Sequence, residues 1–290
     1  MMEDMDITTC YCCDSPDRWT ALRYTAPPVG ETQFTFSNQA YRRQVVCCAH
    51  CGHFMSLHAM DDKALYSQDY VTATYGKSGF RETFERIINL PMESSDNVRR
   101  CIRINAFAEK LFDNKDRGGR SPTILDVGSG LCVFLYGMKK FGWQGTALDP
   151  DERAAKHARE VVKVGSICGD FFQCDPQGTY DAIALNKVLE HVYDPVVMLS
   201  RCLSFLSEGG FVYVEVPDGE AAIHEGANRE EFFVEHHHVF SFASLAMISS
   251  RAGFRVVQLG RLREPSGKFT LYAFLQAPAV ARTQAFGKAS

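Results

Sequence analysis

The segment at residues 123–151, TILDVGSGLCVFLYGMKKFGWQGTALDPD, places a glycine-rich turn after one apolar run and an aspartate at the end of the next. The first run ends at Asp126 and is followed by Gly128 and Gly130. Asp149 closes the second run. Glycines let a backbone turn tightly and approach a ligand, and the next helix directs its N-terminal amides toward the same place. The segment therefore predicts an α/β sheet with a ligand pocket at the carboxyl ends of its strands.

Strand and helix patterns alternate through residues 118–278, which predicts a mostly parallel sheet covered on both faces by helices. Strands are predicted at residues 123–128, 145–149, 166–170, 180–186, 209–217, 254–260 and 269–277. Helices are predicted between them at residues 131–142, 151–162, 195–207 and 241–253. No helical pattern separates the last two strands, so we expect them to be antiparallel neighbours.

The pocket pattern favours a nucleoside without a pyrophosphate, because Val133 stands where a dinucleotide site has its third glycine. Asp149 is placed to accept hydrogen bonds from the two hydroxyls of a ribose. Asp170, after the third strand, suits an adenine amino group, and Phe171 is placed to stack on the base. The candidate cofactor-binding residues are Asp126, Gly128, Ser129, Gly130, Asp149, Pro150, Asp170, Phe171, Asn186 and Lys187.

Six of the eleven cysteines lie within the first 51 residues. Two C-x2-C pairs, Cys10 with Cys13 and Cys48 with Cys51, have the layout of a closed tetrahedral zinc site with a structural role. Nearby residues that leave the exact ligand set open are Cys12, Cys47, His50 and His53. Because the region lacks an apolar core of its own, we expect it to need the metal in order to fold.

The net charge of −4 gives no electrostatic reason to expect nucleic acid or an anionic membrane as a partner. No run of 18 apolar residues is present, and the acidic start MMEDMDITTC is unlike a secretory signal peptide. We therefore expect a cytoplasmic protein of undetermined oligomeric state. Its expected parts are a zinc-binding module at 1–60, a helical connector at 61–117, the α/β domain at 118–278 and a flexible tail at 279–290.

Residues 123–277 resemble the class I S-adenosylmethionine-dependent methyltransferases. The resemblance rests on the glycine-rich loop, the acidic strand end at Asp149, GD at 169–170, LEHVYDP at 189–195 and LSEGGFVYVEVP at 206–217. It implies S-adenosylmethionine as the cofactor and a Rossmann-like sheet of seven strands, the last one antiparallel.

The two cysteine pairs narrow the resemblance to the zinc-containing sugar C-methyltransferases that act on nucleotide-linked deoxysugars. YVTATYGKSGFRETF at 70–84, His191 and EHHHVFS at 235–241 also match. The additional C-terminal domain of that family is not matched, so methylation of oxygen or nitrogen on a related small molecule stays an alternative to methylation of carbon. A nucleotide-linked sugar is the acceptor that the resemblance implies.

The resemblance also implies the catalytic residues, which are His236, Glu235, His191 and a connector tyrosine, Tyr75 or else Tyr70. A histidine is the usual base near neutral pH. His191 follows the fourth strand, where the transferred methyl group should project, and His236 lies on the acceptor side after the fifth strand. Glu235 would orient His236 or act as the base itself. The two following histidines, His237 and His238, are assigned to packing or solvent.

Two other functions stay open from the sequence. The first is methylation of RNA or protein with the zinc module as substrate reader, which the scarcity of basic clusters in residues 1–60 does not favour. The second is a non-catalytic nucleoside sensor, which the combination of intact glycines with a Glu-His pair does not favour. We therefore predict an enzyme that methylates a small sugar-like acceptor.

Overall fold

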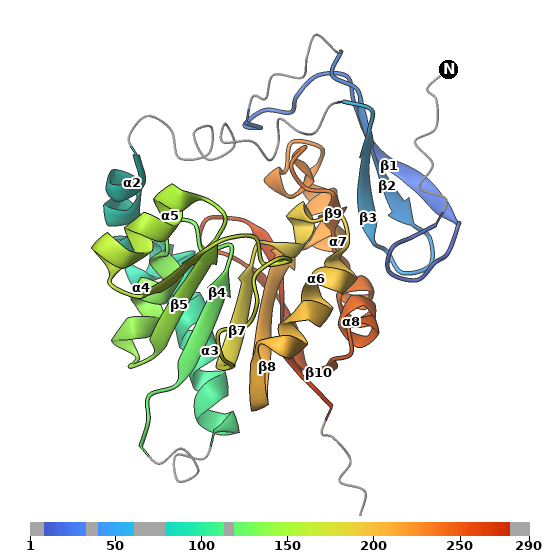
Figure 1. The fold of residues 1–290 in the computed structure, drawn as a ribbon. Helices are drawn as coiled ribbons and strands as arrows, with labels where there is room; N and C mark the ends of the chain where they lie inside the picture. Colours follow the sequence, from blue (N-terminus) through green and yellow to red (C-terminus); the bar gives the residue numbers. More distant parts are fainter. Residues whose placement is uncertain (1–8, 33–39, 61–78, 113–118, 279–290) are drawn as a thin grey trace, which may run out of the picture.

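The structure is a computed structural model that describes residues 9–32, 40–60, 79–112 and 119–278. These residues form one β-sheet of seven strands and one of four. Helices cover the larger sheet, and the smaller sheet, formed mainly by the N-terminal residues, lies to one side of it (Figure 1).

The larger sheet has the strand order β10-β11-β8-β7-β4-β5-β6. Its strands are β4 (Thr123–Val127), β5 (Gln144–Asp149), β6 (Gly165–Cys168), β7 (Tyr180–Asn186), β8 (Leu206–Pro217), β10 (Arg255–Arg263) and β11 (Phe269–Gln276). The strands from β4 to β8 are parallel, and β11 is antiparallel to both of its neighbours. The predicted seven-stranded sheet with an antiparallel last strand is confirmed. Because the strand order reverses between β4 and β7, their carboxyl ends form the crevice where a ligand binds.

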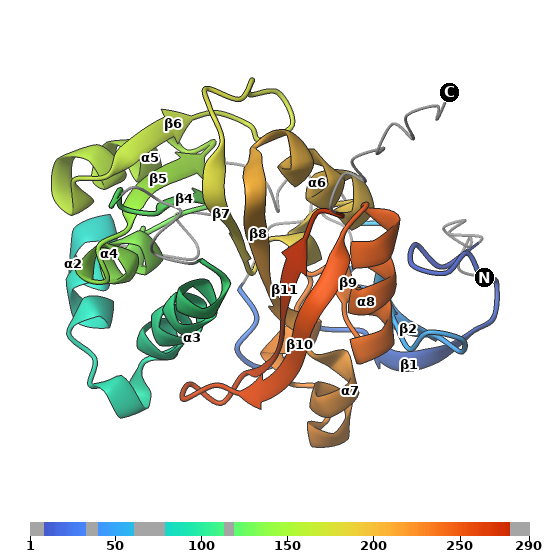
Figure 2. The ribbon, with the colours of Figure 1, turned by 90° about the horizontal axis from the view of Figure 1, so that it is seen from below.

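Helices form two layers, one on each face of this sheet (Figure 2). One layer contains α2 (Gly79–Ile88), α3 (Asp96–Leu111), α4 (Val133–Lys140) and α5 (Glu152–His157), which continues into a π-helical turn at Ala158–Val162. The other layer contains α6 (Pro195–Arg201) and α8 (Phe242–Arg251). Local sequence sets where both helices of the second layer begin. The Asp194 side chain caps α6, and Ser241 and Ser244 form a capping box at α8.

The smaller sheet has the order β1-β2-β3-β9 and joins distant parts of the chain. Its strands are β1 (Arg18–Tyr24), β2 (Arg43–Cys48), β3 (Phe54–His58) and β9 (His238–Val239). β9 pairs with β3 through Met55 opposite His238 and Phe54 opposite Val239. Sequence analysis predicted none of these strands.

The N-terminal region shares its apolar core with the α/β domain, a packing that sequence analysis did not predict. Val45, Cys47 and Phe54 pack with Phe232 and Val239 in one buried cluster. Other residues of the module join the main core beneath α6 and α8. The N-terminal module is therefore stabilised by apolar contacts with the α/β domain as well as by any metal that it binds.

A buried ion cluster fixes α3 on the sheet. Glu215, in the interior of β8, is fully buried and accepts hydrogen bonds from the guanidinium groups of Arg100 and Arg103. Burial acts to raise the pKa of Glu215, but the positive charges, that of Arg100 first, outweigh it and lower the pKa to about 2. The charged state of Glu215 therefore depends on α3 being in place.

Among the described residues, no helix is long and apolar enough to cross a membrane.

Candidate active site and metal centre

The glycine-rich loop after β4 and the end of β5 are held together by the carboxylate of Asp149. Its Oδ2 accepts a hydrogen bond from the Gly130 N–H at 2.8 Å, and its Oδ1 accepts one from the Asp151 N–H at 2.9 Å. Gly128 has a φ of 69°, and a Cβ on it would lie 3.1 Å from the Val188 side chain. Glycine is therefore favoured there by conformation, and a Cβ would require the Val188 side chain to shift.

Two buried polar atoms beside this loop lack a hydrogen-bond partner among the described residues: Ser129 Oγ and Asn186 Oδ1. The Asn186 amide nitrogen donates to Asp126 Oδ1 at 2.9 Å, so the amide oxygen is directed elsewhere. A buried polar atom without a partner is costly unless a ligand satisfies it. Ser129 can donate to a carboxylate and Asn186 can accept from an ammonium group, so this pair fits the amino-acid end of S-adenosylmethionine.

Burial dominates the electrostatics of this end of the sheet. It raises the pKa of Asp126 to about 7 and also raises the pKa of Asp149. The hydrogen bond from Asn186 opposes the shift at Asp126 but does not cancel it. Both carboxylates thus gain from a ligand that brings hydrogen-bond donors, as the ribose hydroxyls and the ammonium group of the cofactor do.

The outer part of the predicted pocket lies at the end of β6. Asp170 is exposed and accepts hydrogen bonds from the Phe172 N–H and from the Gln173 side chain, so it caps a turn while its carboxylate stays accessible. Pro150 is exposed directly after Asp149. Both positions are compatible with contact to a nucleoside and stay predictions.

The structure corrects the role predicted for Phe171. Its ring is 3% exposed and lies in the core, with its centroid 4.9 Å from that of Phe205, so it cannot stack on an adenine. Phe172 is 40% exposed, and it is the ring of this pair that reaches the surface. Two consecutive phenylalanines gave no sequence signal for which of them faces the core.

The role predicted for Lys187 is also corrected. Its ammonium group donates to Thr270 Oγ1 at 2.7 Å, on β11, so the side chain points toward β11 and away from the glycine-rich loop. The left-handed backbone at Lys187, with a φ of 59°, turns the chain in this direction after β7. We call this part of the structure, with His191 and His236, the acceptor end, after the role that the sequence predicts for it. Burial lowers the pKa of this lysine.

His191 and His236 come together at the acceptor end, with ring centroids 4.9 Å apart. Nδ1 of His191 lies 2.9 Å from the Glu235 carbonyl oxygen, and Nδ1 of His236 lies 2.8 Å from the Glu231 carbonyl oxygen. Burial lowers the pKa of His191 to about 4 and the pKa of His236 well below its usual value. Both rings are therefore neutral at physiological pH.

The predicted orientation of His236 by the Glu235 carboxylate is wrong, because the Glu231 carbonyl oxygen takes that position. The Glu235 carboxylate lies instead in the field of Glu31 and Arg43 of the N-terminal module. Burial raises its pKa to about 7, which keeps open a role for Glu235 as a base. Tyr75 and Tyr70 lie outside the described residues.

One carboxylate at this end was missed by sequence analysis. Glu190 precedes His191 in a 3₁₀ turn at Leu189–His191 and is 1% exposed. The signal was present in LEHV, where an acidic residue sits beside the candidate histidine.

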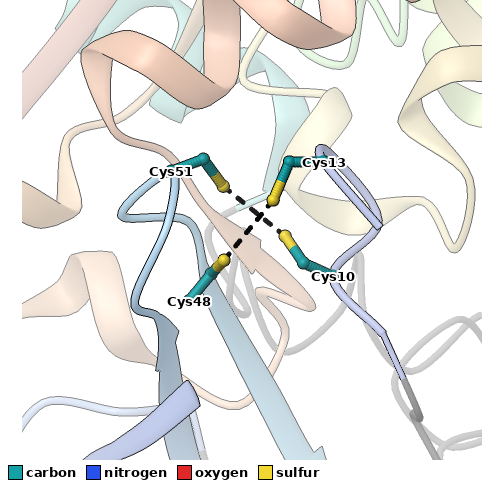
Figure 3. A group of neighbouring side chains, drawn as sticks. All are labelled: Cys10, Cys13, Cys48 and Cys51. Atoms are coloured by element: carbon teal, nitrogen blue, oxygen red, sulfur yellow. Dashed lines mark hydrogen bonds between the residues drawn. The ribbon is translucent and has the colours of Figure 1, made fainter. Parts of the chain in front are cut away.

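The thiols of Cys10, Cys13, Cys48 and Cys51 converge on one point (Figure 3). Their sulfurs lie within 4.8 Å of one another, and the Cys10–Cys51 and Cys13–Cys48 pairs are each 3.5 Å apart. Zinc–sulfur bonds of about 2.3 Å in a tetrahedron place the sulfurs about 3.8 Å apart. The four thiolates therefore fit a tetrahedral zinc ion if the two sulfur pairs at 3.5 Å move slightly apart.

Of the neighbouring candidates for metal ligation, Cys12 lies beside the cluster with its thiol in contact with those of Cys10 and Cys51, whereas the others are directed elsewhere. Cys47 packs in the apolar cluster with Phe54, and His50 is exposed. His53 is buried, with its ring nitrogens 3.2 Å from Ser244 Oγ and 2.9 Å from Nδ1 of His238. His238 in turn contacts the Tyr193 carbonyl oxygen, so this buried pair links the cysteine loop to the acceptor end.

A family model described as a methyltransferase domain matches residues 97–259, which include the glycine-rich loop, Asp149 and the His191–His236 region. The chain belongs to this methyltransferase family. Its α/β domain is a class I S-adenosylmethionine-dependent methyltransferase domain. The family match does not extend to the two cysteine pairs.

Curated relatives share part of the methyltransferase domain. The chain is 32% identical to a ubiquinone biosynthesis O-methyltransferase of Caulobacter vibrioides over 124 residues, which are 39% of this chain and 48% of the relative. It is 31% identical to the Shewanella halifaxensis protein of the same name over 137 residues, 45% of this chain and 58% of the relative. The chain thus spans about half the length of the curated relatives that it matches.

Solved structures share the fold at low identity. A magnesium protoporphyrin IX methyltransferase from Synechocystis superposes with a TM-score of 0.52 at 14% identity, covering 73% of this chain and 100% of that one. A 1,6-didemethyltoxoflavin-N1-methyltransferase from Burkholderia thailandensis gives 0.51 at 17% identity, covering 87% and 99%. Both were solved with S-adenosylhomocysteine bound.

Proposed function

We propose that the protein transfers the methyl group of S-adenosylmethionine to a small sugar or nucleotide-sugar-like acceptor. The observation that carries the proposal is the close approach of two imidazoles, His191 and His236, whose ring centroids lie 4.9 Å apart and whose pKa values are lowered by burial. A neutral imidazole retains a lone pair at physiological pH, which removal of a proton from a hydroxyl or an activated carbon requires. The curated relatives named for O-methylation favour oxygen as the methylated atom.

The cofactor is assigned to the crevice between β4, β5 and β7. Ser129 and Asn186 would satisfy their unpaired atoms on the amino-acid end of the cofactor, and Asp149 would accept from the ribose. The acceptor would lie between the histidines and the N-terminal module. Cys10, Cys13, Cys48 and Cys51 would hold a structural zinc ion, whose chemistry is to fix the cysteine loops.

Methyl-labelled S-adenosylmethionine incubated with the protein and a lysate, followed by separation into small-molecule, RNA and protein fractions, tests the function. We expect label in a small molecule of the size of a sugar nucleotide. Label in RNA or protein would overturn the acceptor class and support the zinc module as a substrate reader. Absence of label in every fraction, with cofactor bound, would overturn methyl transfer and support the sensor function.

The variant His236→Gln tests the role of the acceptor end. We expect turnover to fall by at least about tenfold, a cost of about 1.4 kcal/mol in the barrier, with the affinity for S-adenosylmethionine unchanged. His224→Gln is the matched control, because His224 is exposed and outside this cluster. Equal turnover in the two variants would contradict the proposed role of His236.

A further inference from the structure

Two buried carboxylates at the acceptor end, those of Glu190 and Glu264, lack hydrogen-bond donors. Glu190 is 1% exposed and Glu264 is 4% exposed, and none of their side-chain oxygens has a hydrogen-bond partner among the described residues. Each of the other buried Asp and Glu side chains that the structure describes accepts at least one hydrogen bond. Burying a carboxylate without a donor is costly, so these two side chains are suited to receive a donor from a ligand.

The hairpin between β10 and β11 buries Glu264. Thr270 pairs with Leu262, and the Glu264 N–H extends the ladder by donating to a carbonyl oxygen across the hairpin at 2.8 Å. Because side chains two residues apart in a strand share a face, Glu264 lies on the same face as Thr270. At the tip, the Ser266 N–H and hydroxyl donate to the Asp96 carboxylate at 3.0 and 2.7 Å, which joins the hairpin to the start of α3.

Lys187 is the cation that the two carboxylates share. Its charge acts on both Glu190 and Glu264, but its ammonium group donates to Thr270 Oγ1 at 2.7 Å and to neither carboxylate. Glu190 belongs to the turn that follows Lys187 after β7, whereas Glu264 lies at the end of β10. Two elements far apart in the sequence thus bring an unpaired carboxylate to the same lysine.

The surroundings favour a ligand that donates hydrogen bonds. Burial raises the pKa of Glu190 and of Glu264 to about 7 and outweighs the positive charges near them. A donor that binds the ionised form would lower both pKa values. The charged groups that act on one carboxylate or both come from α3, the turn after β7, β8 and the hairpin: Asp96, Arg100, Lys187, Glu215 and Lys268.

We propose that Glu190 and Glu264 recognise hydroxyl groups of the methyl acceptor beside Lys187. A hydroxyl donates to a carboxylate and can accept from an ammonium group, so a sugar-like acceptor can satisfy the two carboxylates and contact the lysine. A phosphate group is negatively charged, so the nucleotide part of a nucleotide-linked acceptor has to point away from this pair. The inference rests on the proposed function for the class of acceptor, and it adds which part of the acceptor faces the sheet.

Urea denaturation of the full-length protein, without cofactor or acceptor, tests whether the carboxylates lack donors. Because the folded pKa of each is raised, the stability that it contributes at low pH is lost as the pH rises from about 4.5 to about 7. Glu190→Gln and Glu264→Gln avoid this loss, so we expect both to have a higher midpoint than wild type at pH 8. Glu208→Gln, at an exposed position near the start of β8, is the matched control and should keep the wild-type midpoint. A variant whose midpoint does not rise would remove that carboxylate from the site.

The small-molecule fraction of the lysate, added at increasing concentration with methyl-labelled S-adenosylmethionine, tests the ligand. We expect each of the two variants to need at least about tenfold more of this fraction for half-maximal labelling, with a much smaller change in the maximal rate, because uniform binding is lost. The dissociation constant of S-adenosylmethionine should stay unchanged, and Glu208→Gln should behave as wild type.

Half-maximal labelling at the wild-type concentration in both variants would overturn the proposal. An equal fall in the maximal rate and in stability, without a change in that concentration, would show a structural role instead. If the wild-type protein labels no small molecule, the proposed function and the class of ligand are overturned, while raised urea midpoints would still support the two carboxylates as groups that bind a ligand.

Discussion

The cofactor end and the acceptor end of this sheet are built from contacts of very different range. At the cofactor end, Gly130 bonds Asp149 across 19 positions of the chain. At the acceptor end, His53 contacts His238 across 185 positions, and Arg103 contacts Glu215 across 112. The glycine-rich loop and the end of β5 are therefore joined by a local contact, whereas the acceptor end is assembled from the N-terminal module, α3 and the segment after β8.

The two ends also differ in the pKa of a buried carboxylate. Asp126 has a neutral amide as its partner, and burial raises its pKa to about 7. Glu215 is equally inaccessible, but two guanidinium groups lower its pKa to about 2. The comparison shows that a buried carboxylate keeps its charge where guanidinium groups surround it, as at Glu215, and loses it more readily where its partner is a neutral amide, as at Asp126.

Loss of the four-thiolate cluster should have the largest effect on stability. It should impair the acceptor end and leave cofactor binding at the other end nearly unchanged. Binding of structural zinc contributes on the order of 10 kcal/mol in isolated zinc fingers. We expect Cys48→Ser to abolish stoichiometric zinc and loosen the N-terminal sheet, lowering turnover, while the dissociation constant of S-adenosylmethionine changes by less than about twofold, or 0.4 kcal/mol. Elemental analysis measures the zinc content, and calorimetry measures the dissociation constant. A large loss of cofactor affinity would contradict the separation.

Glu215→Gln should give the next largest effect, because it leaves Arg100 and Arg103 without their counter-charge. Removing one partner of a buried ion pair costs about 3–5 kcal/mol of the free energy of unfolding. Urea denaturation followed by circular dichroism measures the loss. Glu85→Gln, in the exposed Arg81–Glu85 pair of α2, is the control and should leave the midpoint unchanged. Similar curves for the two variants would show that the cluster does not hold α3.

Asp149→Ala tests the cofactor end directly. We expect S-adenosylmethionine to bind about 1.5–3 kcal/mol more weakly, because a charge-assisted hydrogen bond is lost and its partners are left unpaired. Calorimetry gives the dissociation constant. Asp151→Ala is the control, since that side chain caps α5 and its loss should cost only helix stability. The assignment of Asp149 fails if its variant binds the cofactor as tightly as wild type does.

Asp126 and Glu215 should also make the stability of the protein depend on pH in opposite directions. The folded pKa of Asp126 is raised, so its contribution to stability is present at low pH and is lost as pH rises from about 4 to about 7. The folded pKa of Glu215 is depressed, so its contribution is lost as pH falls from about 4.5 to about 2. We expect Asp126→Asn to flatten the stability profile only in the upper window, as measured by urea denaturation at a series of pH values. Flattening in the lower window instead would reverse the two assignments.

The sequence predicted the sheet and its antiparallel last strand because each strand carries its own apolar run and the missing helix before β11 is a local signal. The convergence of Cys10, Cys13, Cys48 and Cys51 was also predictable, because the spacing within each C-x2-C pair is a local pattern. The prediction for Phe171 failed because the choice between two adjacent rings is decided by packing against Phe205, which is distant in sequence.

The strands of the N-terminal sheet escaped prediction for a similar reason. β1, β2 and β3 are short, and their buried faces contact Phe232 and Val239, so the pattern has meaning only once those partners are known. Lys187 and Glu215 are charged residues in an environment where charged side chains are unusual. Their partners, Thr270 and the arginines of α3, lie on other elements. No local pattern specifies such pairs.

The pairing of β9 with β3 imposes an order on synthesis. Ribosomes release a chain from its N-terminus, so Phe54 and Met55 emerge long before Val239 and His238, the residues that cover them. Until then the edge of β3 exposes unpaired backbone groups, which favour association with other chains. The cysteine loops of the growing chain therefore belong to an incomplete sheet until β9 has been synthesised. A chaperone or early metal binding would protect the chain from association most effectively in that interval.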